Sequence, residues 1–130
     1  MKKVIFGFLG IIIFALTSTA QTNSKKTQAP APAQSSKATV SKADIEAGKQ
    51  LIAKSDCFAC HKLNEKSVGP SYIDVAKKYP ITEKNINILS EKIIKGGSGV
   101  WGQIPMSPHA TISDQDSKQI VKYILSLNAK

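Results

Sequence analysis

The sequence Cys57-Phe58-Ala59-Cys60-His61 decides how the rest of the chain is interpreted. Two residues separate its cysteines, and a histidine follows the second directly. This spacing is typical of c-type haem attachment, in which both thiols form thioethers with one porphyrin. The histidine then lies under the iron and supplies an axial nitrogen. The motif therefore predicts covalent haem c bound through Cys57 and Cys60, with His61 as an iron ligand.

Two other kinds of site share part of this pattern. A thiol–disulfide oxidoreductase uses a C-x-x-C pair directly, with a thiolate of low pKa in a βαβ setting. No strand pattern precedes Cys57, however. A structural zinc site could use Cys57, Cys60, His61 and His109, but two of these ligands are adjacent and the usual spaced second pair is missing. Both alternatives stay open at this point.

The loop that follows the third predicted helix offers a second axial ligand. Met106 is the only methionine besides Met1, and it lies between Pro105 and Pro108 rather than on a helix face. A stiff loop can present its thioether at a fixed depth. Met/His ligation raises the reduction potential and leaves no open coordination position, which favours electron transfer over peroxidase-type chemistry. His109 is the other candidate ligand, although a lone histidine in such a loop is more often exposed to solvent.

Two further residues have predicted roles around the haem. Pro70 follows Gly69 in a turn, and a carbonyl there would accept the Nδ1 proton of His61 and fix the ring for iron. Trp101 is the only tryptophan, and its indole N–H could donate a hydrogen bond to a haem propionate. The alternative for Trp101 is an ordinary core aromatic.

The first 40 residues differ in composition from the remainder. Residues 1–20 combine two lysines, an apolar run and a small-residue end, which is typical of a secretory signal peptide and predicts a periplasmic protein. An uncleaved segment that anchors the protein to the inner membrane is the alternative. Residues 21–40 are rich in Ala, Pro, Ser and Lys and predict a disordered linker. The folded domain is then expected over residues 41–130.

That domain is predicted to be all-α, with about four helices. The expected N-cap residues are Ser41, Ser71, Thr82 and Ser113. Their helices would cover residues 42–53, a short segment that ends before Pro80, residues 83–95, and a last segment with a buried stripe up to Leu127. Gly48 predicts a close helix crossing, with a chance surface glycine as the alternative. No stretch alternates with a period of two, so no sheet is expected.

The charge of the chain limits its partners. The sequence has 130 residues and a net charge of +9, and all 18 basic residues are lysine. The absence of arginine disfavours nucleic-acid recognition. The lysines are either a solvated surface or a basic face that attracts an acidic redox partner.

Together these residues resemble the bacterial short-chain class I cytochromes c, the small monohaem carriers of respiratory chains. The matching segments are residues 57–61, 68–72, 74–76, 96–106 and 113–127, within a resemblance that covers about 41–130. The resemblance implies an all-α fold around one haem, with His61 as the proximal ligand and Met106 as the distal one. It also implies that Pro70 orients His61 and that Trp101 lies beside a propionate.

What the resemblance implies about function is a periplasmic one-electron carrier rather than an enzyme. Its partners would be a quinol-oxidising complex and a terminal oxidase or reductase, and the protein would be a monomer. One haem edge would face solvent near Lys62 and Lys66. The extension of the ligand loop through Ser107 and His109 has no assigned role.

Overall fold

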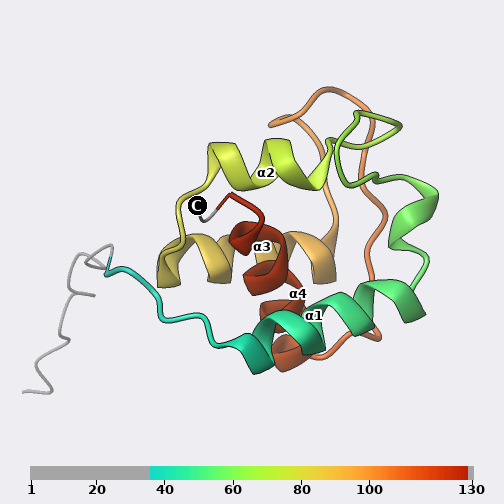
Figure 1. The fold of residues 1–130 in the computed structure, drawn as a ribbon. Helices are drawn as coiled ribbons and strands as arrows, with labels where there is room; N and C mark the ends of the chain where they lie inside the picture. The colour runs from blue at the N-terminus through green and yellow to red at the C-terminus, as the bar shows by residue number, and fades with distance from the viewer. Residues whose placement is uncertain (1–35, 129–130) are drawn as a thin grey trace, which may run out of the picture. The chain divides into compact units, whose positions relative to one another are not determined.

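Four α-helices and one short 3₁₀ turn make up the regular structure of residues 36–128, the part of the chain that the computed structural model describes. They are α1 (Lys42–Lys54), the turn η1 (Cys57–Ala59), α2 (Tyr72–Lys78), α3 (Glu83–Lys95) and α4 (Asp114–Ser126) (Figure 1). Within these residues the only β-type pairings are two isolated bridges. The prediction of an all-α fold with about four helices is confirmed.

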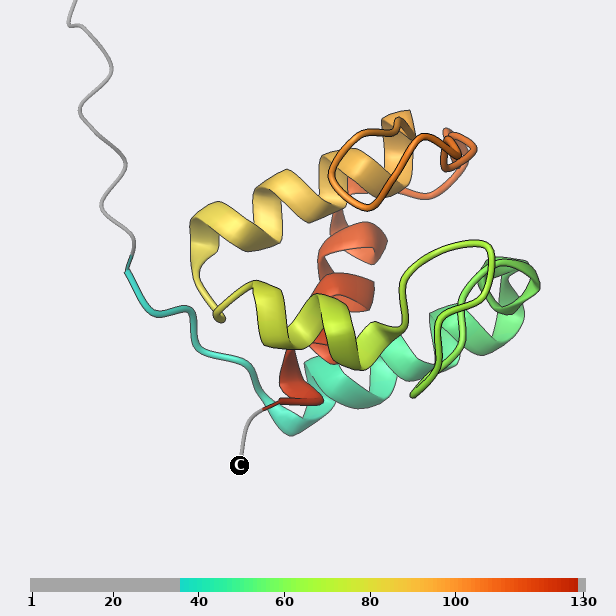
Figure 2. The same ribbon diagram turned by 90° about the horizontal axis from the view of Figure 1, so that it is seen from above.

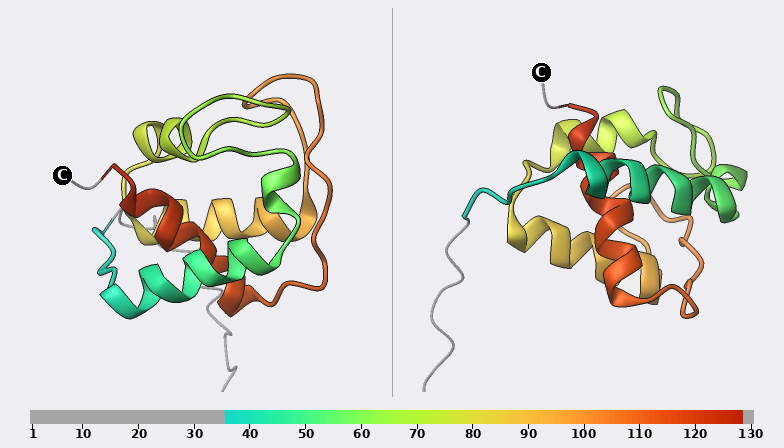
Figure 3. Two further views of the ribbon diagram at one scale, coloured as in Figure 1. Left: turned by 45° about the vertical axis from the view of Figure 1, so that its right-hand side comes forward. Right: turned by 60° about the horizontal axis from the view of Figure 1, so that its bottom comes forward.

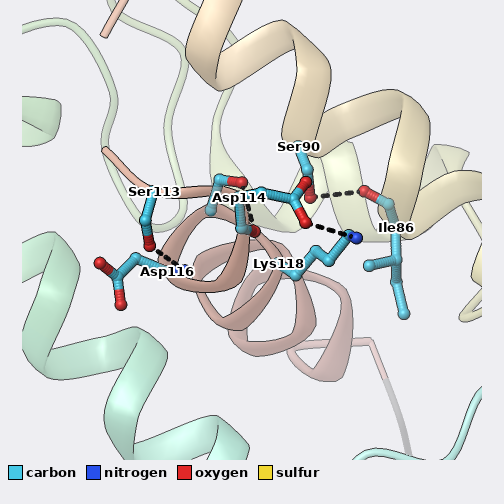
Figure 4. A network of polar contacts seen from close by, with 7 residues as sticks. Ile86, Ser90, Ser113, Asp114, Asp116 and Lys118 are labelled. Carbon is cyan, nitrogen blue, oxygen red and sulfur yellow. Dashed lines mark hydrogen bonds and ion pairs between the residues drawn. The ribbon is translucent and has the colours of Figure 1, made fainter. Parts of the chain in front are cut away.

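Each α-helix begins at the N-cap predicted for it. The hydroxyls of Ser41, Ser71, Thr82 and Ser113 accept hydrogen bonds from backbone N–H groups in the first turns of α1, α2, α3 and α4. Figure 4 shows the cap at Ser113, and the ion pair between Lys118 and Asp114 one turn further along α4. These bonds satisfy N–H groups that have no partner within the helix, so short polar sequences fix where each helix starts.

Helix α4 is the centre of the packing and contacts α1, α2 and α3. Its inner face contributes Ile120, Val121 and Leu125, each almost fully buried. Ile52 of α1 and Ile86 of α3 pack into the same cluster. The i, i+3, i+4 spacing of these apolar residues places them on one side of each helix, which is why the core forms there.

The predicted close crossing at Gly48 is confirmed. Gly48 is buried in α1, and a Cβ atom at this position would lie 2.8 Å from the Cβ of Tyr123 and closer still to the carbonyl oxygen of Gln119. The backbones of α1 and α4 therefore touch at a point that has no room for a side chain.

The folded part begins earlier than predicted. Residues 36–40 belonged to the expected linker, but Ala38 is buried and its N–H donates to the carbonyl of Ile81 at 3.2 Å. An isolated bridge also joins Lys37 to Thr82. We call residues 36–40 the strap. The buried Ala38, its bond to Ile81 and the bond from the Glu83 N–H to the Ser36 carbonyl hold this extended segment against the α2–α3 connection, although its composition is polar. The predicted signal peptide and residues 21–35 lie outside the described residues.

Two irregular segments lie together at one end of the molecule. We call residues 55–70 the attachment segment and residues 96–112 the methionine loop. Figures 1 and 2 show both on the side opposite the strap of residues 36–40, and Figure 3 shows the same from two further directions. No helix among residues 36–128 is long and apolar enough to cross a bilayer.

Candidate haem site

The turn η1 gathers the three residues of the motif. The backbone N–H groups of Cys60 and His61 both donate to the carbonyl of Cys57, at 3.3 and 3.0 Å. Cys57 is half-buried and packs against the hydrophobic core, whereas Cys60 is exposed. The tight turn thus holds two thiols and one imidazole within a single short segment that begins at the core.

The ring of His61 is fixed from the side of Pro70. Its Nδ1–H donates to the Pro70 carbonyl at 2.8 Å, which is the hydrogen bond predicted from sequence. Because a carbonyl can only accept, the neutral ring carries its proton on Nδ1 and leaves the lone pair on Nε2. A carbonyl bonded to the far nitrogen in this way is the usual support for a metal-binding histidine.

Gly69 and Tyr72 pack against the same ring. A Cβ atom at Gly69 would lie 2.5 Å from the Cε1 of His61, so only glycine leaves the imidazole where it is. Tyr72, which is 3 % exposed, stacks on His61 with ring centroids 5.5 Å apart and an interplanar angle of 16°. Its backbone N–H also donates to the carbonyl of Lys62 at 3.0 Å. Helix α2 therefore anchors the attachment segment directly beside His61.

The thiol of Cys57 lacks the property that a disulfide exchanger needs. Burial, and then the charge of Asp56, raises its pKa above the ordinary value of 9.0. A reactive thiol in a redox C-x-x-C pair has a lowered pKa, because the thiolate is the nucleophile. The shift runs in the opposite direction here and disfavours the thiol–disulfide alternative.

Met106 is held by the backbone rather than by a helix. Its N–H and carbonyl exchange hydrogen bonds with Gly97, both at 3.0 Å. Gly96, at φ 70°, ends α3 and passes so close to the Met106 carbonyl that a Cβ would collide with it. The side chain of Met106 is half-buried against the core. A fixed, inward-packed thioether fits the predicted role of an iron ligand.

The expectation that His109 is exposed is wrong. Its side chain is 18 % exposed, and its Nε2 lies 3.1 Å from the carboxylate of Asp56. The backbone N–H of His109 also donates to the carbonyl of Ile93, which pulls the residue against α3. Within residues 36–128 no group of three His, Cys, Asp or Glu side chains is placed to hold a metal ion, so the zinc alternative has no support.

Trp101 lies in the methionine loop but not in the core. Its side chain is 38 % exposed, and the Nζ of Lys78 lies 5.3 Å from the ring centroid, a cation–π contact. The alternative of an ordinary core aromatic is therefore wrong, because the loop runs over the surface rather than through the core. Its place beside a propionate stays a prediction.

The side chains around these residues could cover a large apolar group. Seven large hydrophobic side chains are exposed in residues 36–128, and all but Ile88 lie in the attachment segment or the methionine loop. They are Phe58, Leu63, Val68, Val100, Trp101 and Ile104. Such gathering of exposed apolar side chains marks a binding surface. The same two segments carry two thiols, an imidazole whose Nε2 is free, and a half-buried thioether. These groups are the ones that hold haem c.

Comparison with known proteins agrees with this site. The sequence profile described as cytochrome c matches residues 45–128. The chain belongs to the cytochrome c family. It is 51% identical over 71 residues to cytochrome c-552 of Hydrogenobacter thermophilus, a match that covers 55% of this chain and 71% of that protein. It is 46% identical over 72 residues to cytochrome c-552 of Nitrosomonas europaea, covering 55% of this chain and 70% of the relative.

The fold is also that of solved cytochromes. The crystal structure of Nitrosomonas europaea cytochrome c552 superposes with a TM-score of 0.58 at 44% identity, covering 62% of this chain and 99% of that one. This cytochrome is accordingly a bacterial class I monohaem protein, with covalently bound haem c and a role in electron transfer to and from other proteins. Haem c, when bound, supplies an iron that alternates between the ferric and ferrous states.

Sequence reasoning missed several residues of this cytochrome's site. Gly69 was noted only as part of a turn, and its contact with His61 went unpredicted. The stacking of Tyr72 on His61 and the contact between Asp56 and His109 were also missed. The position of Gly69 directly before Pro70 was a usable signal, because a chain that brings the Pro70 carbonyl to Nδ1 must pass close to the ring.

Proposed function

We propose that His61 and Met106 are the axial ligands of the haem iron. The observation that carries this proposal is the orientation of His61: its Nδ1–H is occupied by the Pro70 carbonyl, so Nε2 is the nitrogen available for iron. Met106 stands on the neighbouring loop, fixed by its paired backbone bonds to Gly97. Histidine and methionine together would leave no open coordination position.

Each protein group then has a task in electron transfer. The carbonyl of Pro70 holds the imidazole in one tautomer, and Gly69 and Tyr72 limit its rotation. The Gly97–Met106 bridge keeps the thioether at one depth. Because both ligands are held by backbone bonds and packing, little needs to rearrange when an electron arrives or leaves. A site of this kind favours electron transfer and disfavours turnover of a small substrate, so we propose a carrier and not an enzyme.

The proposed location is the periplasm, with residues 1–20 as the signal for export. The proposed partners are a quinol-oxidising complex and a terminal oxidase or reductase. A net charge of +9, with exposed Lys62 and Lys66 in the attachment segment, favours acidic docking surfaces on these partners.

The test is an optical and electrochemical comparison of the holoprotein with Met106→Ala. The wild-type ferric protein should show the weak far-red band of a sulfur–iron bond. Met106→Ala should lose that band, bind added imidazole, and have a midpoint potential lower by on the order of 0.1 V or more, within the ~0.8 V that axial ligands span. Gln103→Ala is the matched control, because Gln103 is exposed in the same loop and is not one of the apolar side chains of the binding surface. An unchanged spectrum and potential in Met106→Ala would reject Met106 as the ligand.

A further inference from the structure

One hydrogen bond joins the attachment segment to the methionine loop. The Nε2–H of His109 donates to the Oδ1 of Asp56 at 3.1 Å, across 53 positions of sequence. No second hydrogen bond links these two segments in the described part of the chain. Cys57 of one segment and Met106 of the other each pack against the shared hydrophobic core.

Both ends of this bond are fixed in place. Asp56 is the residue before η1, and its carbonyl accepts from the N–H of Ala59 at 2.9 Å. The backbone of His109 donates to Ile93 of α3 and accepts from Ile112, both at 3.0 Å. A side-chain bond between two anchored backbones sets the separation of the segments that carry them. Here one segment bears the thiols and His61, and the other bears Met106.

Filling space in the core does not by itself explain a histidine at position 109. The Asp56 carboxylate only accepts hydrogen bonds, so Nε2 carries a proton. Nδ1 points the other way and is buried without a hydrogen-bond partner among residues 36–128. An unpartnered buried nitrogen is unfavourable, and an apolar side chain would fill the same space without that penalty. What the histidine adds over an apolar residue is its bond to Asp56.

We propose that Asp56 and His109 are positioning residues for the axial methionine. Their bond holds the methionine loop against the attachment segment and so favours the Met106 sulfur over any competing ligand of the iron. The inference rests on Met106 being that ligand, as proposed above. Asp56 is 77 % exposed, so solvent screens the pair and its contribution is small. Breaking it should therefore strengthen binding of a competing ligand about two- to fivefold.

The experiment is an imidazole titration of the full-length ferric holoprotein in mildly alkaline buffer, where imidazole is neutral. Asp56→Ala and His109→Leu should each lower the apparent Kd for imidazole about two- to fivefold, and the double variant should lower it no further. Leucine is chosen at 109 because it fills the space and leaves no cavity for the added ligand. His109→Gln, which keeps an N–H donor, should stay near wild type. Glu65→Ala is the control, because Glu65 is exposed in the same segment and makes no ion pair in the described residues.

Two outcomes separate this inference from the proposed function. If Met106→Ala loses the far-red band while Asp56→Ala and His109→Leu bind imidazole as wild type does, the positioning role is overturned and the ligand assignment stands. If the wild-type protein lacks the band, both are overturned. Additive effects of the two substitutions would also overturn the pairing. A purely structural role would lower the urea midpoint of unfolding and leave the Kd for imidazole unchanged.

Discussion

His61 donates from Nδ1 to the carbonyl oxygen of Pro70 at 2.8 Å, and Gly69, directly before Pro70, leaves no room for a side chain beside the ring. Two consecutive residues thus fix the tautomer of one imidazole and pack against one part of its ring, while Tyr72 stacks on its face. The Gly-Pro pair acts on iron through His61, although neither residue is expected to touch the metal.

Gly69→Ala should disturb this arrangement. The added Cβ would lie 2.5 Å from Cε1 and 2.8 Å from Nδ1 of His61, so the ring must shift and its bond to Pro70 must lengthen. We expect the holoprotein to lose about 1–3 kcal/mol of unfolding free energy, the usual effect of overpacking. Urea unfolding followed at the haem absorption measures this. Ser67→Ala, at an exposed position nearby, should match wild type. A Gly69→Ala protein of wild-type stability would contradict the packing described.

Replacing both thiols should abolish covalent haem. Cys57→Ala combined with Cys60→Ala removes the two sulfur atoms that form the thioethers. The product of expression with a haem-attachment system should then lose all its haem on extraction with acidified acetone. Cys60→Ala alone should retain one thioether. Colour that resists extraction in the double variant would disprove attachment through these cysteines.

Gly48→Ala tests the helix crossing by the sign of its effect. In an exposed helix this substitution stabilises by about 1 kcal/mol, because alanine has the higher helix propensity. At Gly48 the new methyl would meet the backbone of Gln119, which cannot rotate away, so the clash should outweigh the gain. We expect a net loss of about 1–3 kcal/mol in urea unfolding. Lys49→Ala, one position along on the exposed face, should change stability by less than about 0.5 kcal/mol. A more stable Gly48→Ala protein would rule out the close crossing.

The carboxyl of Asp44 should make the free energy of unfolding depend on pH. Hydrogen bonds from Ser41, and then the bond and charge of Lys122, hold the pKa of the Asp44 carboxyl below its ordinary value of 3.8. A carboxyl with a lowered pKa in the folded state stabilises the fold above its unfolded pKa, and loses that contribution as the pH falls through the folded pKa.

Asp44→Asn should therefore lower the unfolding free energy at neutral pH by about 1 kcal/mol, the usual value of a hydrogen bond at a helix N-cap. The difference from wild type should shrink as the pH is lowered below about 4. Urea unfolding at several pH values measures both. Glu91→Gln, which removes an exposed ion pair with Lys95, should show a smaller effect at neutral pH. A constant difference at all pH values would exclude the carboxylate as its source.

The positive charge of the protein, including Lys62 and Lys66, should make the rate of electron exchange depend on ionic strength. With the anion ferricyanide as oxidant, the rate should fall as ionic strength rises, and with hexaamminecobalt(III), a cation, it should rise. Lys66→Gln in the attachment segment should lower the ferricyanide rate by about twofold, since a single exposed charge is screened. Lys84→Gln, at the start of α3 beside the strap, should have little effect. Equal effects of the two variants would show that the charge acts globally and not at the haem end.

Most of the fold could be predicted because its decisive signals are local. Each N-cap hydroxyl bonds an N–H a few residues later, so Ser41, Ser71, Thr82 and Ser113 identify their helix starts within a short window of sequence. The bond between His61 and Pro70 spans only nine positions, inside a turn with a recognisable sequence. The role of Gly48 could be predicted because a glycine on the apolar face of a helix costs helix stability, which a close approach of a second backbone offsets.

The features that escaped prediction depend on contacts between distant segments. Nothing near Asp56 indicates that His109, 53 positions later, will lie beside it. Residues 36–40 look like the linker that precedes them, and only the position of Ile81 explains why Ala38 is buried. Trp101 is a large aromatic residue of the kind that often packs in a core. The path of its loop nevertheless places it at the surface, next to Lys78.

The crossing of α1 and α4 has a consequence for the order of folding. The two backbones meet near residues 48 and 119, so the contact closes the chain between these two positions into a single long loop. Forming it cannot begin until the last helix has been synthesised, and closure of so long a loop is slower than formation of any single helix. Both cysteines lie inside that loop. We therefore expect the polypeptide around them to stay open until α4 packs on α1, which leaves an interval in which haem can be attached to an unfolded chain.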